Sequence, residues 1–257
     1  MNGNLLHQRV REQLARVENE RDVRVLFAAE SGSRAWGFES ADSDYDVRFV
    51  YVHRRDWYLS VEERRDVIER PLTDELDLSG WDLRKALRLL CKSNAALLEW
   101  FKSPVVYQHD PEFTAGFNAL AARFYSPRRC FTHYLHMAFG TWRDSLRDRQ
   151  EVSSKKYLYA FRPLLACRWI ERQRGEVPME FQQLVDAVLP EPDLRAALKE
   201  LMEKKKTANE LSMEPPVELL SLFIERELAR LDALSMPNDS TGDPEELNGF
   251  FRRHALP

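Results

Sequence analysis

The chain has 257 residues, a net charge of −4 and 44% hydrophobic residues, which suits one large domain or two small ones with a well-packed core. Its three cysteines are widely spaced and odd in number, which argues against a disulfide framework or a zinc pattern and favours buried thiols in a reducing compartment. No apolar run approaches the roughly 20 residues of a membrane span and no signal peptide opens the chain, so we expect a cytoplasmic protein without a membrane partner.

The first part of the chain mixes helical and strand patterns. Apolar residues at helical spacing predict an amphipathic N-terminal helix, and short runs rich in valine predict the strands that follow it. The expected elements are a helix at 5–20, strands at 23–29 and 45–52, a helical turn within 54–65, strands at 66–70 and 75–78, helices at 81–91 and 95–101, and an edge strand at 105–107.

From Pro111 onward the pattern is almost wholly helical. Helices are expected at 111–124, 127–150, 154–174, 181–188, 193–207 and 216–234. Pro163 should kink or interrupt the third of these, because proline lacks an N–H and clashes with the preceding turn. Residues 235–245 are typical of a flexible linker, and 246–255 of a short helix or a disordered tail. A mixed front followed by a helical back predicts an α+β fold.

One motif stands out between the first two predicted strands. Gly32-Ser33 is followed, ten residues later, by Asp44-Tyr45-Asp46 at the start of the next strand. A small-residue turn after a strand can present backbone N–H groups to phosphate. Carboxylates two residues apart on a strand project from one face and can bridge a pair of Mg²⁺ ions. The motif therefore predicts a phosphate cradle beside a metal clamp.

This pattern resembles the signature of the DNA polymerase beta nucleotidyltransferase superfamily. The longer run from Gly32 to Phe49 resembles one branch of it, the predicted nucleotidyltransferases associated with bacterial and phage RNA-repair operons. Further similar stretches lie at 76–87, 98–104 and 155–164. The resemblance implies a mixed-sheet catalytic domain at 1–125, a helical domain at 126–235 that closes the nucleotide cleft, and a linker and tail at 236–257.

The same resemblance implies a third carboxylate on a neighbouring strand. In the family this role falls on the acid before Ser-Gly-Trp, which is Asp77 here. It would orient or deprotonate the attacking hydroxyl and complete the shell of the second metal. Glu75 has the same strand parity, and Asp82 stands at the expected start of a helix, where a capping role is the simpler explanation. Asp77 is preferred over both.

Several side chains near the motif are candidates for nucleotide binding. The hydroxyl and N–H of Ser33 would bind the terminal phosphates, and Gly32 permits close backbone approach. Arg34 has the geometry to pair bidentately with phosphate, although a surface arginine is a simple alternative. Lys85, one helical turn beyond the expected sheet edge, is placed to reach a triphosphate.

A second set of candidates lies on one face of the helix expected at 154–174. Lys155, Tyr159 and Arg162 fall at positions i, i+4 and i+7, which combines cations with a ring that can stack on a base. A helix whose long cations simply reach solvent is the alternative. Lys156 and Tyr157 point elsewhere on the same helix and compete for the role.

Charge is distributed unevenly along the chain. Residues 121–175 carry a net charge of +8 and the remainder −12, which indicates a phosphate-bearing partner, with ordinary solvated helix faces as the alternative. The run Lys204-Lys205-Lys206 is expected to be a solvated helix end. Walker, dinucleotide-binding and nucleophile-elbow motifs are absent, so ATPase, dehydrogenase and hydrolase interpretations lack support.

Together these features predict a nucleotidyltransferase dependent on two Mg²⁺ ions, with Mn²⁺ as a substitute. Asp44, Asp46 and Asp77 would hold the metals, and an acceptor hydroxyl would attack the α-phosphate of a nucleoside triphosphate and expel pyrophosphate. The resemblance and the basic block favour RNA as the acceptor. A small molecule or a protein hydroxyl stays open, as in an antitoxin-like enzyme that nucleotidylates a protein. The rival interpretation is a non-catalytic nucleotide or RNA sensor.

Overall fold

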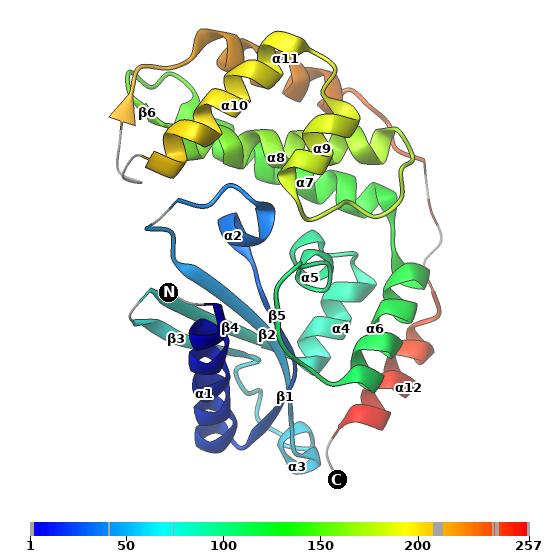
Figure 1. Ribbon diagram of the computed structural model, residues 1–257. Coiled ribbons are helices and arrows are strands. Elements are labelled where there is room, and N and C mark those ends of the chain that lie inside the picture. The colour runs from blue at the N-terminus through cyan, green and yellow to red at the C-terminus, as the bar shows by residue number, and fades with distance from the viewer. Residues whose placement is uncertain are drawn as a thin grey trace. The chain divides into compact units, whose positions relative to one another are not determined.

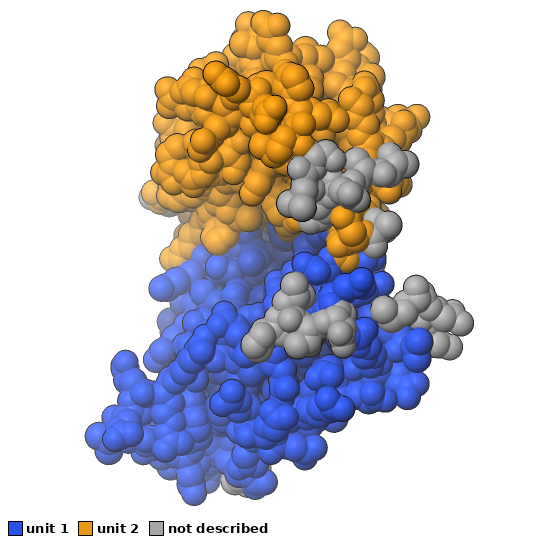
Figure 2. Space-filling model, turned by 90° about the vertical axis from the view of Figure 1, so that its left-hand side faces the viewer, with its two compact units in different colours: residues 1–35, 44–125, 240–257 blue, residues 36–43, 126–239 orange. Residues whose placement is uncertain are grey.

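The computed structural model describes residues 3–40, 42–73, 75–207, 213–237, 239 and 242–255. Internal contacts divide the chain into two units, coloured separately in Figure 2. Unit 1 comprises residues 1–35, 44–125 and 240–257, and unit 2 comprises residues 36–43 and 126–239. The chain therefore enters unit 2 briefly between the two halves of the Gly-Ser/Asp-x-Asp motif, and it returns to unit 1 at its C-terminal end.

Unit 1 is built on a five-stranded mixed sheet with strand order β3-β4-β2-β1-β5. Its strands are β1 (Val23–Glu30), β2 (Tyr45–His53), β3 (Val67–Thr73), β4 (Leu76–Asp82) and β5 (Val106–His109). β2 and β4 are parallel, whereas the other neighbouring strands are antiparallel. Because parallel strands begin at the same edge, the first residues of β2 and β4 lie side by side.

Helices cover both faces of this sheet (Figure 1). The helices that cover the faces are α1 (Gly3–Arg21), α4 (Leu83–Cys91), α5 (Ala95–Trp100), α6 (Pro111–Phe124) and α12 (Pro244–His254). The short helices α2 (Gly32–Trp36) and α3 (Arg55–Tyr58) follow the ends of β1 and β2. On one face α1 packs Leu6, Val10, Leu14 and Val17 into a core with β1, β2 and β4. On the other face α4, α5, α6 and α12 enclose a second core with Leu26, Val50 and Val52. Alternation of side chains along each strand supplies both faces.

Helix α12 agrees with the short helix expected at 246–255, but it packs into unit 1 and is not part of a separate linker and tail at 236–257. The Asp243 carboxylate caps the helix by accepting from Glu245 N, and Pro244 occupies the first turn, where its missing N–H is harmless. Leu247 and Phe250 are buried in the core over α4 and α6, so the C-terminal helix is an integral part of unit 1. The polar linker composition just before it concealed this short apolar face.

Unit 2 is helical and is organised around α8 (Ser154–Glu171), which packs against helices on several sides. Its other elements are α7 (Pro127–Thr141), a π-helical turn η1 (Trp142–Leu146), α9 (Phe181–Val188), α10 (Pro192–Thr207), α11 (Glu218–Asp232), and the short paired strands β6 (Val152–Ser153) and β7 (Met213–Glu214). Pro163 does not interrupt α8, which is continuous through it. Packing by α7, α9, α10 and α11 outweighs the lost hydrogen bond.

The α+β fold class expected from the sequence is confirmed, and two boundaries are corrected. The helix expected from residue 81 begins only at Leu83, because Trp81 and Asp82 continue β4 in register with Val50 and Tyr51. The helix expected over 127–150 leaves α-helical geometry at Trp142. Within the described part of the chain, no helix combines the length and apolar character that crossing a membrane requires.

Candidate active site

The Gly-Ser turn lies directly against the second half of the motif. Gly32 has a φ of 60°, and a Cβ placed on it would lie 2.0 Å from Oδ2 of Asp46. Ser31 N donates to the backbone oxygen of Asp46 over 2.8 Å, which ties the end of β1 to the start of β2. Glycine is needed at position 32 for both its left-handed backbone and its close approach to the carboxylate. Ser33 follows it in α2 and is buried.

Asp46 and Asp77 face each other across the parallel strands. They are register partners in the β2–β4 ladder. One nitrogen of Arg48, Nη2, lies 2.7 Å from Oδ1 of Asp46 and 2.7 Å from Oδ2 of Asp77. Arg48 Nη1 also donates to the backbone oxygen of Asp77 at 3.1 Å. A single guanidinium therefore binds both carboxylates and offsets part of their mutual repulsion.

Asp44 is placed differently from these two acids. It is exposed and precedes the first residue of β2, and its backbone oxygen accepts from Arg34 Nε at 3.2 Å. The Arg34 guanidinium lies 3.9 Å from the centre of the Tyr45 ring, so Arg34 braces the backbone beside Asp44. Among the described residues, no three His, Cys, Asp or Glu side chains converge closely enough to hold a metal ion. Asp46 and Asp77 are thus brought together, and Asp44 lies beside them without completing a triad.

The two other acids considered for the third position lie elsewhere. Glu75 occupies the turn before β4 with a φ of 68°, and its backbone oxygen accepts from Tyr45 N. Asp82 is fully buried at the opposite end of β4, where it caps α4 through Arg84 N and accepts from the Tyr58 hydroxyl. Burial raises the pKa of the Asp82 carboxyl. Of the three acids, Asp77 is the one beside Asp46.

A buried glutamate that the sequence analysis did not identify accepts a hydrogen bond from the backbone of Asp46. Glu30, the last residue of β1, is 1% exposed, and it accepts from Asp46 N at 2.8 Å and from the Tyr107 hydroxyl. Burial raises the pKa of Glu30 to about 7, against the opposing effect of these two hydrogen bonds. The sequence did contain a feature that could have identified Glu30, because it is an acid at the end of an apolar strand just before Ser-Gly-Ser. Arg48 could have been identified in the same way, since it lies two residues after Asp46 on the same strand face.

Lys85 lies away from Asp46 and Asp77. It follows the end of β4 distant from Asp77, about 16 Å along the strand at the usual rise per residue. There its Nζ pairs with Oδ1 of Asp66 at 3.0 Å. Lys85 therefore lies at the opposite end of the strands from the Gly-Ser turn, where it is paired with Asp66.

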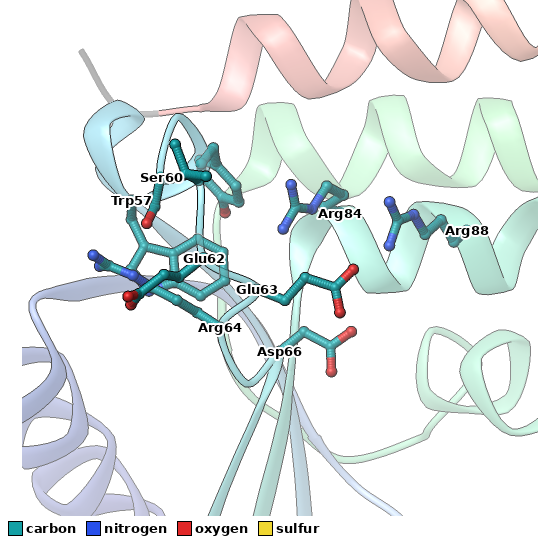
Figure 3. Close-up of a pocket in the computed structure, with 10 residues that line it drawn as sticks. Trp57, Ser60, Glu62, Glu63, Arg64, Asp66, Arg84 and Arg88 are labelled. Atoms are coloured by element: carbon teal, nitrogen blue, oxygen red, sulfur yellow. The ribbon is translucent and has the colours of Figure 1, made fainter.

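That opposite edge carries a pocket of about 190 Å³, lined from α3, the loop after it and α4 (Figure 3). Arg84 and Arg88 extend toward it from successive turns of α4, and Trp57 forms part of its wall while stacking on His53 at 3.9 Å. Its charged lining residues are Arg64, Arg84, Arg88, Glu62, Glu63 and Asp66. Cations and carboxylates are equal in number, so the lining selects neither an anionic nor a cationic ligand.

The residues predicted on the helix face of α8 lie in unit 2. Tyr159 contacts the rings of Trp36 and Phe38 edge-on, and Lys155 Nζ lies 5.7 Å from the centre of the Tyr159 ring. Lys155 and Tyr159 are partly exposed, whereas Arg162 is only 1% exposed. The Arg162 guanidinium lies over Trp36 and donates to the Met179 backbone oxygen. Arg162 thus packs inside unit 2, while Lys155 and Tyr159 present part of their surface.

The basic block at 121–175 is not one solvent-facing surface. Arg168, buried in α8, binds Glu227 at 2.7 Å and also contacts Glu191. Arg143 pairs with Asp144 at the surface. Counting charge along the sequence therefore overstates the cations presented to a polyanion.

Comparisons with known proteins show a matching family model, a similar bacterial protein and a similar solved structure. Residues 6–253 match a family model described as "RlaP: RNA repair pathway DNA polymerase beta family". The chain is 45% identical over 226 residues to the uncharacterized protein YcgL of Bacillus subtilis (strain 168), which covers 88% of this chain and 86% of that protein. A solved nucleotidyltransferase-like protein from Exiguobacterium sibiricum 255-15 aligns over 95% of this chain and 75% of its own, with 13% identity and a TM-score of 0.33. The family match spans residues of both units.

Proposed function

Because the chain belongs to the RNA repair pathway DNA polymerase beta family, we propose that it is a Mg²⁺-dependent nucleotidyltransferase that modifies an RNA end. It transfers a nucleoside monophosphate from a nucleoside triphosphate to an acceptor hydroxyl and releases pyrophosphate. The observation that carries the proposal is the pairing of Asp46 with Asp77 across parallel strands, with the Gly32 turn packed against Asp46.

Two carboxylates of the expected donor set, Asp46 and Asp77, suit a hard divalent cation. Asp46 and Asp77 offer carboxylate oxygens to one shared position, where the Arg48 nitrogen now lies, and Asp44 stands beside them. Oxygen ligands of this kind suit Mg²⁺ or Mn²⁺. When bound, such ions would neutralise the triphosphate and polarise its α-phosphorus. Arg48 must then yield its place between the carboxylates or share it.

The chain's own residues would align and activate the two substrates. Asp77 accepts the proton of the acceptor hydroxyl, whose oxygen forms a bond to the α-phosphorus while the bond to the bridging oxygen of the β-phosphate breaks. Pyrophosphate leaves with that electron pair, so the reaction needs no further co-reactant. Gly32, Ser33 and Arg34 are the candidates for holding the phosphates, and Lys155 and Tyr159 for contacting the base or the acceptor.

RNA is the acceptor favoured by the family description, and the exposed cations of the 121–175 block are consistent with it. A sensor that binds nucleotide or RNA without turnover is the second candidate. The observation in its favour is Arg48, which binds both Asp46 and Asp77 and offsets part of their charge. The two candidates differ in whether pyrophosphate is released.

Pyrophosphate release in the presence of Mg²⁺, total RNA and each of the four nucleoside triphosphates tests the proposal. We expect release by the wild type, and a loss of at least about 100-fold in Asp46→Asn and in Asp77→Asn. Glu75→Gln is the matched control, because it neutralises a nearby acid that does not face Asp46. Release that survives in both Asn variants, or equal loss in Glu75→Gln, would contradict the assignment of the carboxylates.

A further inference from the structure

The ten residues that separate Ser33 from Asp44, here called the spacer (34–43), are held by side chains distant in sequence. Residues 36–43 pack within unit 2, although the motif residues on either side belong to unit 1. Phe38 is 1% exposed and meets the rings of Tyr159 and Phe181 edge-on. Trp36 lies 4.6 Å beneath the Arg162 guanidinium. Trp36 and Phe38 of the spacer are thus embedded in the helical unit.

The most specific of these contacts comes from Lys205 in α10. Its Nζ donates to the backbone oxygen of Phe38 at 2.7 Å and lies 5.3 Å from the centre of the Phe38 ring. Lys205 is 4% exposed, whereas its neighbours Lys204 and Lys206 are exposed. The expectation that all three lysines form a solvated helix end is therefore wrong for Lys205. The reason is that the spacer, 167 residues earlier in the chain, covers it.

Burial of an ammonium group is unfavourable by several kcal/mol unless it is compensated. Here the compensation is directed at a main-chain carbonyl and a ring of the spacer, so the lysine fixes the backbone position of Phe38 as well as its side chain. A methionine of similar volume would fill the same space without that hydrogen bond. The charge at position 205 is thus better suited to holding one backbone atom than to stabilising a core.

Two serines near the end of the spacer are hydrogen-bonded to each other, and the second of them directly precedes Asp44. Ser40 N donates to Ser43 Oγ at 3.0 Å, Ser43 N donates to Ser40 O at 3.2 Å, and the two hydroxyls lie 2.8 Å apart. Both serines are buried. Ser43 immediately precedes Asp44, so the backbone that carries Phe38 leads through these two serines to Asp44 and Asp46.

We infer that Lys205 is a positioning residue for the nucleotidyltransferase motif, because it anchors the spacer that sets the placement of Asp44 and Asp46. The inference rests on the proposed function for its catalytic consequence, but the anchoring itself does not depend on activity. The contacts of Lys205 that carry the inference are those with Phe38. Lys205 is expected to act on the rate of the chemical step through the backbone of the spacer.

Lys205→Met tests the inference, with Lys206→Met as the matched control and Lys205→Arg as the conservative variant. Two measurements are needed: hydrogen exchange of the backbone amides in residues 36–43, and kcat and KM for pyrophosphate release. For Lys205→Met we expect spacer exchange about tenfold faster and kcat about tenfold lower, with KM for the nucleotide changed less than about threefold. In Lys205→Arg, spacer exchange and kcat should lie between those of Lys205→Met and the wild type, and Lys206→Met should match the wild type.

A merely structural lysine would lower the melting temperature without moving either readout at temperatures well below it. Unchanged exchange in Lys205→Met would overturn the inference, as would an unchanged kcat despite faster exchange. If Lys205→Met does not fold, Lys205→Gln takes its place with the same criteria. If the wild type releases no pyrophosphate, the proposed function fails. Faster spacer exchange would then still establish the anchor, and unchanged exchange would refute it.

Discussion

Replacing Gly32 with alanine tests the close packing of the Gly-Ser turn on Asp46. The new Cβ would stand 2.0 Å from the Asp46 carboxylate and would sit on a backbone with a φ of 60°. Left-handed backbone costs alanine about 1 kcal/mol. Relieving the clash requires the Asp46 carboxylate to shift, and we expect the shift to break its charge-assisted hydrogen bond to Arg48, a loss of about 2 kcal/mol in this partly buried site. Gly32→Ala should therefore destabilise unit 1 by about 3 kcal/mol.

Gly175→Ala is the control that isolates the backbone contribution. Gly175 has a φ of 78°, yet a Cβ placed on it would meet nothing within 4 Å. It should lose only about 1 kcal/mol, so its melting temperature should exceed that of Gly32→Ala by roughly 4–8 °C. Scanning calorimetry gives the comparison, and pyrophosphate release should fall in Gly32→Ala alone. Equal melting temperatures and equal activities in the two variants would refute the packing argument.

Three further predictions concern buried or paired charges. Arg48→Met should leave two adjacent carboxylates without their cation, so added Mg²⁺ should raise its melting temperature more than that of the wild type; equal increments would contradict this. Because the pKa of Glu30 is raised from 4.5 to about 7, its contribution to stability is complete below pH 4.5 and is lost as pH rises through 7. Between pH 4.5 and 7 the free energy of unfolding, measured with urea, should fall for the wild type relative to Glu30→Gln by on the order of 3 kcal/mol. The same pH dependence in both proteins would contradict this. Glu227→Leu should cost up to about 3–5 kcal/mol because it leaves the buried Arg168 paired only with the more exposed Glu191, and adding Arg168→Met should recover most of that loss in calorimetry; a fully additive double variant would argue against the pairing.

Secondary structure was predictable where local chemistry and packing agree. The bounds of α6 and α9 match the expected helices at 111–124 and 181–188. For α6 the reason is visible in the sequence, because Asp110 caps the helix and Pro111 opens it. Strand β4 extends beyond the expected strand at 75–78, because pairing with β2 keeps Trp81 in an extended conformation. Such pairing cannot be predicted from the local sequence.

The sequence predicted the motif residues of the candidate site but not the side chains that contact them or the spacer. The resemblance to the polymerase beta superfamily was sufficient to expect Asp77 near Asp46, whereas strand parity alone left Glu75 open; the ladder between β2 and β4 places Asp46 and Asp77 side by side. Arg48 and Glu30 were missed because their importance comes from distances across strands. Lys205 was missed for a related reason: its burial depends on a segment far away in sequence, whereas a lysine run by itself indicates exposure.

The central claim is that this chain transfers a nucleoside monophosphate, and the fate of two labels in one nucleoside triphosphate tests it most directly. With Mg²⁺ and RNA present, a label on the α-phosphate should become covalently attached to the acceptor, while a label on the γ-phosphate should appear in pyrophosphate. Asp77→Asn should abolish both signals. A γ-label found on the acceptor, or an α-label that remains entirely in free nucleotide with every acceptor offered, would contradict nucleotidyl transfer.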